Sequence, residues 1–238
     1  MTHLTRAGNL VRVSSERAEL GTFLFADIAG YTALTEAHGD ADATELAISF
    51  CRELSGIADA SGGEVVKTIG DAVMVRHGDP SQALQLGLAA ANDVISGHGF
   101  PAVRVGMHHG PALARAGDWF GATVNLAARV AALAAGGEVL VTGAVRDHVA
   151  ELTSVRLEPR GEHRVRNIAE PVELFAAVPA DERSDTRHLD PVCRMLVDES
   201  QAVGSLRHRG TVYRFCSLEC AGRFAGDPDA YARPPSAP

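Results

Sequence analysis

The segment EVVKTIGDAVMVRH, residues 64–77, constrains the fold of this chain more than any other stretch. Two short apolar runs within it are separated only by Gly70 and Asp71. Short strands joined by two turn-forming residues predict an antiparallel hairpin, here with a carboxylate at its tip. The elements that flank the hairpin then decide which kind of sheet it belongs to.

Apolar patterns on both sides of the hairpin predict alternating strands and helices. Apolar runs bounded by glycine or polar residues indicate strands, and apolar residues at helical spacing indicate helices. The expected strands are 21–28, 64–69, 72–77, 102–110, 136–142, 153–158 and 171–178, and the expected helices are 40–60, 80–95 and 121–134. The order βαββαβ, with additions, predicts a ferredoxin-like α+β fold in which helices cover a sheet.

Shifts in composition divide the chain into five parts. A polar, proline-containing stretch near residue 180 predicts a linker between two structured units. The expected parts are an N-terminal extension at 1–19, a large domain at 20–178, the linker at 179–187, a small α+β module at 188–232 and a disordered tail at 233–238.

Overall composition excludes some classes of function. The net charge of −8 argues against a nucleic-acid-binding protein with a basic face. The N-terminus has no apolar signal-peptide core and no run of about 18 apolar residues occurs, so we expect a cytoplasmic protein without a membrane span. In that compartment the four cysteines are expected to be thiols or metal ligands rather than disulfides.

Two carboxylates lie where predicted strands end. Asp27 follows an apolar strand, and Asp71 lies at the tip of the hairpin. Carboxylates at adjacent strand ends would suit a pair of hard cations, Mg²⁺ or Mn²⁺, whose coordination substrate phosphates complete. Each aspartate taken alone also fits a turn or cap residue, and spacing does not prove that the two converge.

Lys67 is the only lysine in the chain, because the rest of the 22 basic residues are arginine. A genome that favours arginine codons would leave one lysine by chance. The alternative is a position that needs a compact ammonium on a flexible stem, which a planar guanidinium does not replace. The neighbourhood of Lys67 has to decide between the two.

Four segments, in order, resemble those of a known family. FADIAGYT, KTIGDAVM, RVGMHHGPALA and DWFGATVNLAARV resemble the signature segments of the class III nucleotidyl cyclase catalytic domain. The segment GEHRVRNIAEPVELFAAV is similar to the end of such domains, so the resemblance covers about residues 20–178. It implies an adenylate cyclase that converts ATP to 3′,5′-cyclic AMP and pyrophosphate by a two-metal mechanism.

The resemblance also implies a role for each matching residue. Asp27 and Asp71 match the aspartates that bind Mg²⁺ or Mn²⁺, and Ile28 would add its backbone carbonyl. Lys67 and Asp118 match the pair that reads the purine. Without the motif, Asp118 would be interpreted as a surface turn residue after a glycine.

Asn125 and Arg129 match the pair that orients the ribose and stabilises charge on the transferring phosphate. Residues four apart share a helix face, although this spacing is also common by accident. The family's sites lie between two catalytic domains, which implies a head-to-tail homodimer with two equivalent sites. The lysine that contacts the triphosphate in many members is missing here, and Arg164 or Arg166 would replace it.

The chemistry of adenine agrees with the Lys67 and Asp118 roles. An ammonium can donate to N1 of adenine and a carboxylate can accept from its 6-amino group, whereas guanine reverses both signs. The pair therefore favours ATP over GTP. The alternatives are a guanylate cyclase and a catalytically weak nucleotide-binding protein with a metal-responsive regulatory role. His108 and His109 are candidate proton carriers by chemistry alone, and we expect them to be ordinary strand residues.

Three of the four cysteines gather near the C-terminus, in DPVCRMLVDE and TVYRFCSLECAGRFAGDPDAY. These segments resemble the small YHS family over residues 188–232, with Arg194 where that family usually has glycine. The fourth cysteine, Cys51, falls on the apolar face of the first predicted helix and is expected to be a core residue.

Cys193, Cys216 and Cys220 would suit a second metal site. Cys216 and Cys220 are four apart and face the same way on a helix, and three thiolates suit Zn²⁺ or Cu⁺. The alternative is a set of buried thiols in a small core. A metal or redox signal at this module would then regulate the cyclase. The fourth ligand is left open among His188, Asp190 and His208.

Overall fold

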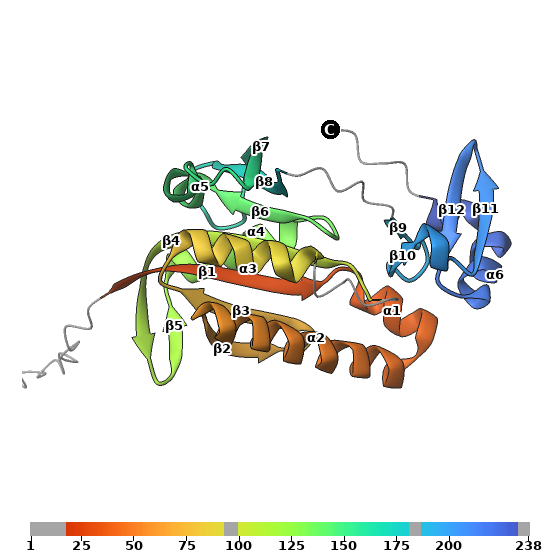
Figure 1. Cartoon of the computed structure of the whole chain (residues 1–238), viewed down its shortest axis with the longest axis horizontal. Coiled ribbons are helices and arrows are strands. Elements are labelled where there is room, and N and C mark those ends of the chain that lie inside the picture. The colour runs from red at the N-terminus through yellow and green to blue at the C-terminus, as the bar shows by residue number, and fades with distance from the viewer. Residues whose placement is uncertain (1–17, 93–99, 181–186, 233–238) are drawn as a thin grey trace, which may run out of the picture.

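The computed structural model describes residues 18–92, 100–180 and 187–232 (Figure 1). Nearly all of the expected N-terminal extension, most of the linker, the C-terminal tail and the end of the second predicted helix lie outside the described residues. A large sheet with its helices forms one part of the molecule. A smaller group of C-terminal elements lies beside one end of that sheet (Figure 1).

The large sheet is centred on β1, which pairs antiparallel with β3 on one side and with β4 on the other. Its one parallel pairing among the described residues joins β4 to β6. In spatial order the strands are β2 (Glu64–Ile69), β3 (Ala72–His77), β1 (Glu19–Ile28), β4 (Val103–Arg115), β6 (Val139–Thr142), β8 (Val172–Pro179) and β7 (Val155–His163). The predicted βαββαβ order and α+β class are confirmed.

Alternation along β1 divides the interior into two layers. Leu24, Ala26 and Ile28 join the main core under the helices α2 and α3, whereas Phe23 and Phe25 belong to a second cluster on the opposite face. Side chains of a strand alternate between the two faces of a sheet, which produces this division. The helices of this part are α1 (Tyr31–His38), α2 (Asp40–Ser61), α3 (Pro80–Asn92), α4 (Ala122–Leu133) and α5 (Gly143–Val149).

The helix α4 packs directly on β4 at Gly106. A Cβ atom added at Gly106 would lie 1.9 Å from the backbone nitrogen of Ala131 and 2.5 Å from the carbonyl carbon of Val130. Only glycine permits this approach of helix to strand. The close contact fixes the position of α4, which carries two of the predicted site residues.

Within the large domain, the sequence analysis did not predict three short elements: α1, α5 and β5 (Asp118–Phe120), which pairs with β4. Helices of eight and seven residues have too few turns to show a clear period, and such short helices depend on tertiary packing. Gly30 and Gly39 bound α1 and both have positive φ, so this helix is set off by two turns that glycine allows.

The C-terminal part contains two small hairpins and two helices. A hydrophobic cluster joins it to the rest of the molecule, because Leu34 and Ala37 of α1 pack with Phe215 and Phe224. Its elements are β9 (Arg187–Leu189), β10 (Leu196–Asp198), β11 (Gly204–His208), β12 (Thr211–Phe215), α6 (Leu218–Gly226) and α7 (Pro228–Tyr231), with one 3₁₀ turn (Glu199–Gln201).

Candidate active site and cysteine cluster

Asp27 and Asp71 meet at one end of the central strands. Asp27 is the penultimate residue of β1 and lies opposite Ala72 of β3, next to the turn that carries Asp71. The two carboxyl groups are close enough for Asp27 to raise the pKa of Asp71 through its charge and hydrogen bonding. The structure therefore brings together the two aspartates that the sequence analysis singled out.

Arg104 on β4 faces the same carboxylates. Its Nη2 and Nε atoms lie 2.6 and 3.1 Å from Oδ2 of Asp27. The pKa of Asp71 is raised to about 6, first by burial and then by the charge and hydrogen bond of Asp27, while the charge of Arg104 acts in the opposite direction. Two half-buried carboxylates beside one guanidinium carry a net negative charge when all three groups are ionised. This donor set fits a hard divalent cation.

Ile28 ends β1 directly after Asp27, and its side chain is buried in the main core. The core therefore holds the backbone at this point firmly. The expected contribution of its carbonyl to a metal stays a prediction.

Lys67 and Asp118 form an ion pair between β2 and β5, with Nζ 2.6 Å from Oδ2. The hydrogen bond from Lys67 lowers the pKa of Asp118, and so does the backbone N–H of Trp119. Trp119 is buried, and its ring packs against Phe23 and under the guanidinium of Arg76. The packed tryptophan thus helps to hold Asp118 in place through its backbone N–H.

Asn125 and Arg129 lie one turn apart on α4. Asn125 is exposed and Arg129 is half-buried. Within the described ranges, neither side chain makes a hydrogen bond or an ion pair with another residue. Both polar groups are therefore available to a ligand or to a second protein chain.

The predicted site residues fall into two groups in one chain. Asp27 lies at the end of β1 that leads into α1, whereas β5 with Asp118 lies at the opposite end of β1 (Figure 1). No hydrogen bond or ion pair joins the two groups in the part of the chain that the structure describes. Arg164 and Arg166 are exposed in the connection between β7 and β8.

His108 and His109 lie within β4, as expected. Nδ1 of His108 lies 2.8 Å from the hydroxyl of Thr142, and Nδ1 of His109 lies 2.9 Å from that of Thr22. Burial, with a smaller contribution from the charge of His109, lowers the pKa of His108 to about 4. A half-buried imidazole that stays neutral and is hydrogen-bonded to a neighbouring strand fits a structural role.

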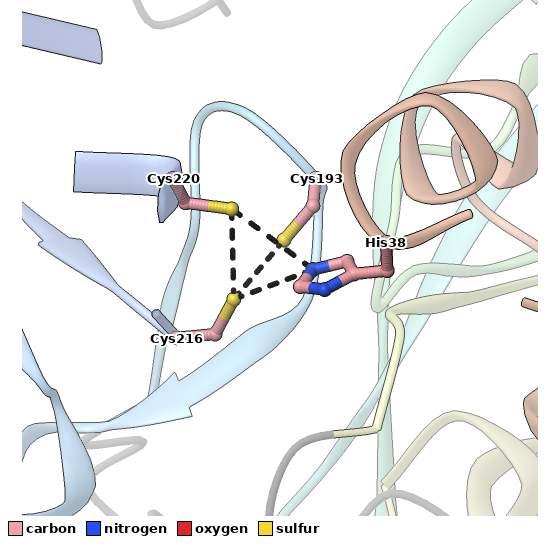
Figure 2. Close-up of side chains that lie close together, drawn as sticks. All are labelled: His38, Cys193, Cys216 and Cys220. Atoms are coloured by element: carbon pink, nitrogen blue, oxygen red, sulfur yellow. Dashed lines mark hydrogen bonds between the residues drawn. The ribbon is translucent and has the colours of Figure 1, made fainter. Parts of the chain in front are cut away.

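The three C-terminal cysteines converge on one point, and Figure 2 shows them around the ring of His38. The Sγ of Cys216 lies 3.4 Å from that of Cys193 and 3.8 Å from that of Cys220. Nε2 of His38 lies 3.6 Å from Cys216 and 3.9 Å from Cys220. All four potential ligand atoms lie within 4.8 Å of one another.

The fourth potential ligand is His38, and the prediction that it would be His188, Asp190 or His208 is wrong. His208 pairs instead with Asp229, and His188 lies on β9 outside the cluster. Sequence analysis missed His38, which ends α1 and precedes Cys216 by 178 positions. No local pattern links residues so far apart, and the only available signal was the histidine itself.

Asp190 is buried and holds the cysteine loops rather than joining the cluster. Its Oδ1 accepts hydrogen bonds from the backbone N–H groups of Val192 and Cys193, and its Oδ2 accepts one from Cys216. Hydrogen bonds from Cys193 and Cys216 lower the pKa of Cys220. Cys51 lies half-buried against the main core, away from these residues.

The fold is that of a nucleotide cyclase, and comparison with known proteins gives the family. Residues 13–176 match the adenylate and guanylate cyclase catalytic domain. The chain therefore belongs to the class III adenylate and guanylate cyclase family, as the sequence motifs predicted. None of its described helices is both long and apolar enough to cross a membrane.

Curated relatives are similar to the chain over the same region. The pH-sensitive adenylate cyclase MT1302 of Mycobacterium tuberculosis (strain CDC 1551 / Oshkosh) is 38% identical over 160 residues, which cover 65% of this chain and 39% of that protein. An adenylate cyclase of Streptomyces coelicolor is 33% identical over 157 residues, which cover 66% and 40%. The chain thus spans about two fifths of the length of these relatives.

Solved structures show the same fold. The adenylyl cyclase CyaB from P. aeruginosa aligns with a TM-score of 0.60 and 26% identity, over 71% of this chain and 98% of that one. The adenylate/guanylate cyclase/hydrolase from Silicibacter pomeroyi aligns with a TM-score of 0.60 and 26% identity, over 68% and 98%.

Proposed function

We propose that this chain is an adenylate cyclase that converts ATP to 3′,5′-cyclic AMP and pyrophosphate. The observation that carries the choice of ATP is the ion pair between Lys67 and Asp118, at 2.6 Å. The adenylate cyclase names of the relatives support it.

The ion pair would read adenine by two hydrogen bonds. The Lys67 ammonium would donate to N1, and the Asp118 carboxylate would accept from the 6-amino group. Guanine presents an N–H and a carbonyl at these positions, so it would set donor against donor and acceptor against acceptor. Mismatched polar groups in a site discriminate strongly between ligands.

The carboxylate pair and α4 would handle the phosphates. Divalent Mg²⁺ or Mn²⁺ held by Asp27, Asp71 and the Ile28 carbonyl would lower the pKa of the ribose 3′-hydroxyl and neutralise the triphosphate. The 3′-oxygen would bond to the α-phosphorus while the bond to pyrophosphate breaks and the hydroxyl proton passes to water. Asn125 would orient the ribose, and Arg129 would donate hydrogen bonds to the charge that develops on the α-phosphate.

A complete site would need two copies of the chain. Asp118 lies on β5, which pairs with β4 beyond the start of β1, whereas Asp27 lies near the other end of β1, so each copy would supply one half to its partner. A two-fold dimer of this kind forms two equivalent sites. Leu113 and Phe120, exposed apolar side chains near Asp118, support an interface there.

The direct test is cyclic nucleotide production by the purified protein with ATP and GTP in parallel, each with Mn²⁺. Cyclic AMP from ATP with little product from GTP is the expected result. Comparable product from GTP would contradict the adenine assignment and leave a cyclase. A dimeric protein that makes neither product would favour the alternative of a nucleotide-binding regulatory protein.

A further inference from the structure

We propose that His38, Cys193, Cys216 and Cys220 form a zinc site that fastens the C-terminal elements to α1 and thereby fixes the segment that carries Asp27. Zinc binding does not depend on the proposed function. Only the consequence for Asp27 rests on it.

Four of the six distances between the potential ligand atoms are close to those of a tetrahedron around a metal ion, and all six are within 4.8 Å. Zinc bonds of about 2.3 Å to sulfur and about 2.0 Å to nitrogen place sulfur atoms about 3.8 Å apart and sulfur about 3.5 Å from nitrogen. The measured sulfur distances are 3.4 and 3.8 Å, and the distances from sulfur to Nε2 of His38 are 3.6 and 3.9 Å. A disulfide would need sulfur atoms about 2.05 Å apart, so the cysteines are separate thiols.

The ligand types and their surroundings suit zinc. Three thiolates and one imidazole make a closed Cys₃His set, which is typical of structural zinc. Asp190 accepts three backbone N–H bonds, two of them from Cys193 and Cys216 themselves, so it fixes two ligand loops from outside the cluster. Cys193 and Cys220 are buried, which protects the site from competing water.

One ligand comes from outside the C-terminal part, so a metal bound here would link that part to the catalytic fold. His38 is the last residue of α1, which belongs to the catalytic fold. Other contacts also join α1 to the C-terminal part. Leu34 and Ala37 pack in the cluster around Phe224. Arg223 donates a hydrogen bond to the carbonyl of Glu36. A metal bound here would join two parts that are far apart in the sequence.

Arg194, which follows Cys193, contacts the segment that follows Asp27. Arg194 has a φ of 66°, a conformation usual for glycine, and its side chain lies against Gly30. A Cβ atom at Gly30 would lie 2.7 Å from Cγ of Arg194. The carbonyl of Arg194 accepts from the N–H of Ala102, whose own carbonyl accepts from Ala29. Residues two and three positions after Asp27 are thus held by the loop that carries a zinc ligand.

Zinc binding by the reduced, metal-free full chain tests the site. Competition with a chromophoric chelator measures affinity for Zn²⁺ alone, and Co²⁺ substitution reports thiolate ligands by sulfur-to-metal charge-transfer absorption. We expect one tight zinc and a thiolate-cobalt spectrum. His38→Ala and Cys220→Ser should lower zinc affinity by at least about 10-fold. The controls are His188→Ala, a histidine outside the cluster, and Cys51→Ser, a cysteine on α2; both should bind zinc as the unaltered chain does.

Two results would overturn the shared site. Absence of tight zinc from the unaltered chain would exclude it. Unchanged zinc affinity and cobalt spectrum in His38→Ala would mean that the C-terminal part binds metal without α1. Folding of each variant is checked by circular dichroism, and Cys193→Ser supplies a second variant should Cys220→Ser fail to fold.

The link to Asp27 is tested by the Mn²⁺ dependence of cyclic AMP formation. Loss of zinc, or His38→Ala, should raise the Mn²⁺ concentration for half-maximal activity by about 10-fold, since outer-shell changes weaken metal sites to this extent. An unchanged Mn²⁺ requirement in a protein that binds zinc and turns over would overturn the link. Failure of the proposed function can be told apart from failure of the link. In the first case neither the unaltered chain nor His38→Ala would make cyclic AMP, whereas zinc binding could still be measured.

Discussion

Arg104 donates two hydrogen bonds to a single carboxylate oxygen of Asp27, with Nη2 at 2.6 Å and Nε at 3.1 Å. The two residues face each other across β1 and β4. The guanidinium therefore supplies positive charge at the carboxylates where the proposed function requires a divalent cation.

Replacing Arg104 by glutamine should separate folding from metal binding. Without the guanidinium, the metal-free protein should lose about 1–2 kcal/mol of unfolding free energy because Asp27 and Asp71 repel each other without compensation. Mn²⁺ should then raise the melting temperature more in Arg104→Gln than in the unaltered chain. Arg156→Gln is the control, because its ion pair with Glu158 lies on the exposed surface of β7. Equal shifts with Mn²⁺ in all three proteins would contradict this role of Arg104.

Mixing two inactive variants tests the shared site. Asp27→Ala and Lys67→Ala should each abolish or nearly abolish turnover, because each removes one half of both sites. An equimolar mixture that exchanges subunits should recover about one quarter of the full activity, since half of the dimers would be mixed and each would hold one intact site. Cyclic AMP formation after exchange measures this. A mixture of Asp27→Ala with Asp71→Ala should recover nothing, and recovery there would contradict the arrangement.

Lys67→Met should weaken selection for adenine. The ammonium that donates to N1 is lost, and the carboxylate of Asp118 remains without its partner. We expect kcat/KM for ATP to fall by about 100-fold and that for GTP to fall much less. The unfolding free energy should change by less than about 1 kcal/mol, because the ion pair is partly exposed. A parallel loss for both nucleotides would show that Lys67 does not read the base.

His108 should make the protein less stable in mild acid. Burial, with a contribution from His109, lowers its pKa from the ordinary 6.5 to about 4, so the unfolded chain binds a proton that the folded chain does not. The unfolding free energy should therefore fall as the pH drops from about 6.5 to about 4, by on the order of 3 kcal/mol. Urea unfolding at several pH values measures the slope.

The comparison for this pH effect is His108→Gln, which cannot titrate and should show a flatter dependence over the same range. His163→Gln changes a histidine of β7 whose ring hydrogen-bonds only to a backbone carbonyl among the described residues, and this variant should keep the original slope. Identical slopes in all three proteins would show that His108 does not carry the effect.

The contact of α4 with β4 predicts a contrast between two glycines. Gly106→Ala would bring Cβ into the backbone of Ala131 and should cost about 3 kcal/mol or more of unfolding free energy. Gly56→Ala meets open space within α2 and should stabilise by about 0.5–1 kcal/mol, because alanine favours the helix. Denaturant unfolding of both variants measures these changes in unfolding free energy. A small destabilisation by Gly106→Ala would mean that α4 can shift away from β4.

The sequence by itself determined the features that depend on local patterns. Alternating and helical periodicities predicted the hairpin around Asp71, the long helix α2 and the βαββαβ order, because these elements are long enough to show their period. The cyclase motifs identified the family. The spacing of Cys216 and Cys220 predicted that their thiols lie close together, which is confirmed at 3.8 Å, but their placement on one helix is wrong because Cys216 precedes α6. In each case the informative residues lie close together in the chain.

Tertiary structure alone decided which distant groups meet. Nothing near His38 in the chain indicates that it lies 3.6 Å from Cys216, and nothing near Asp27 indicates Arg104 as its partner. The short elements α1 and β5 likewise have no clear period, because packing against the rest of the molecule stabilises them rather than local propensity. The candidate zinc site depends on α1, and so it became visible only once the chain was folded.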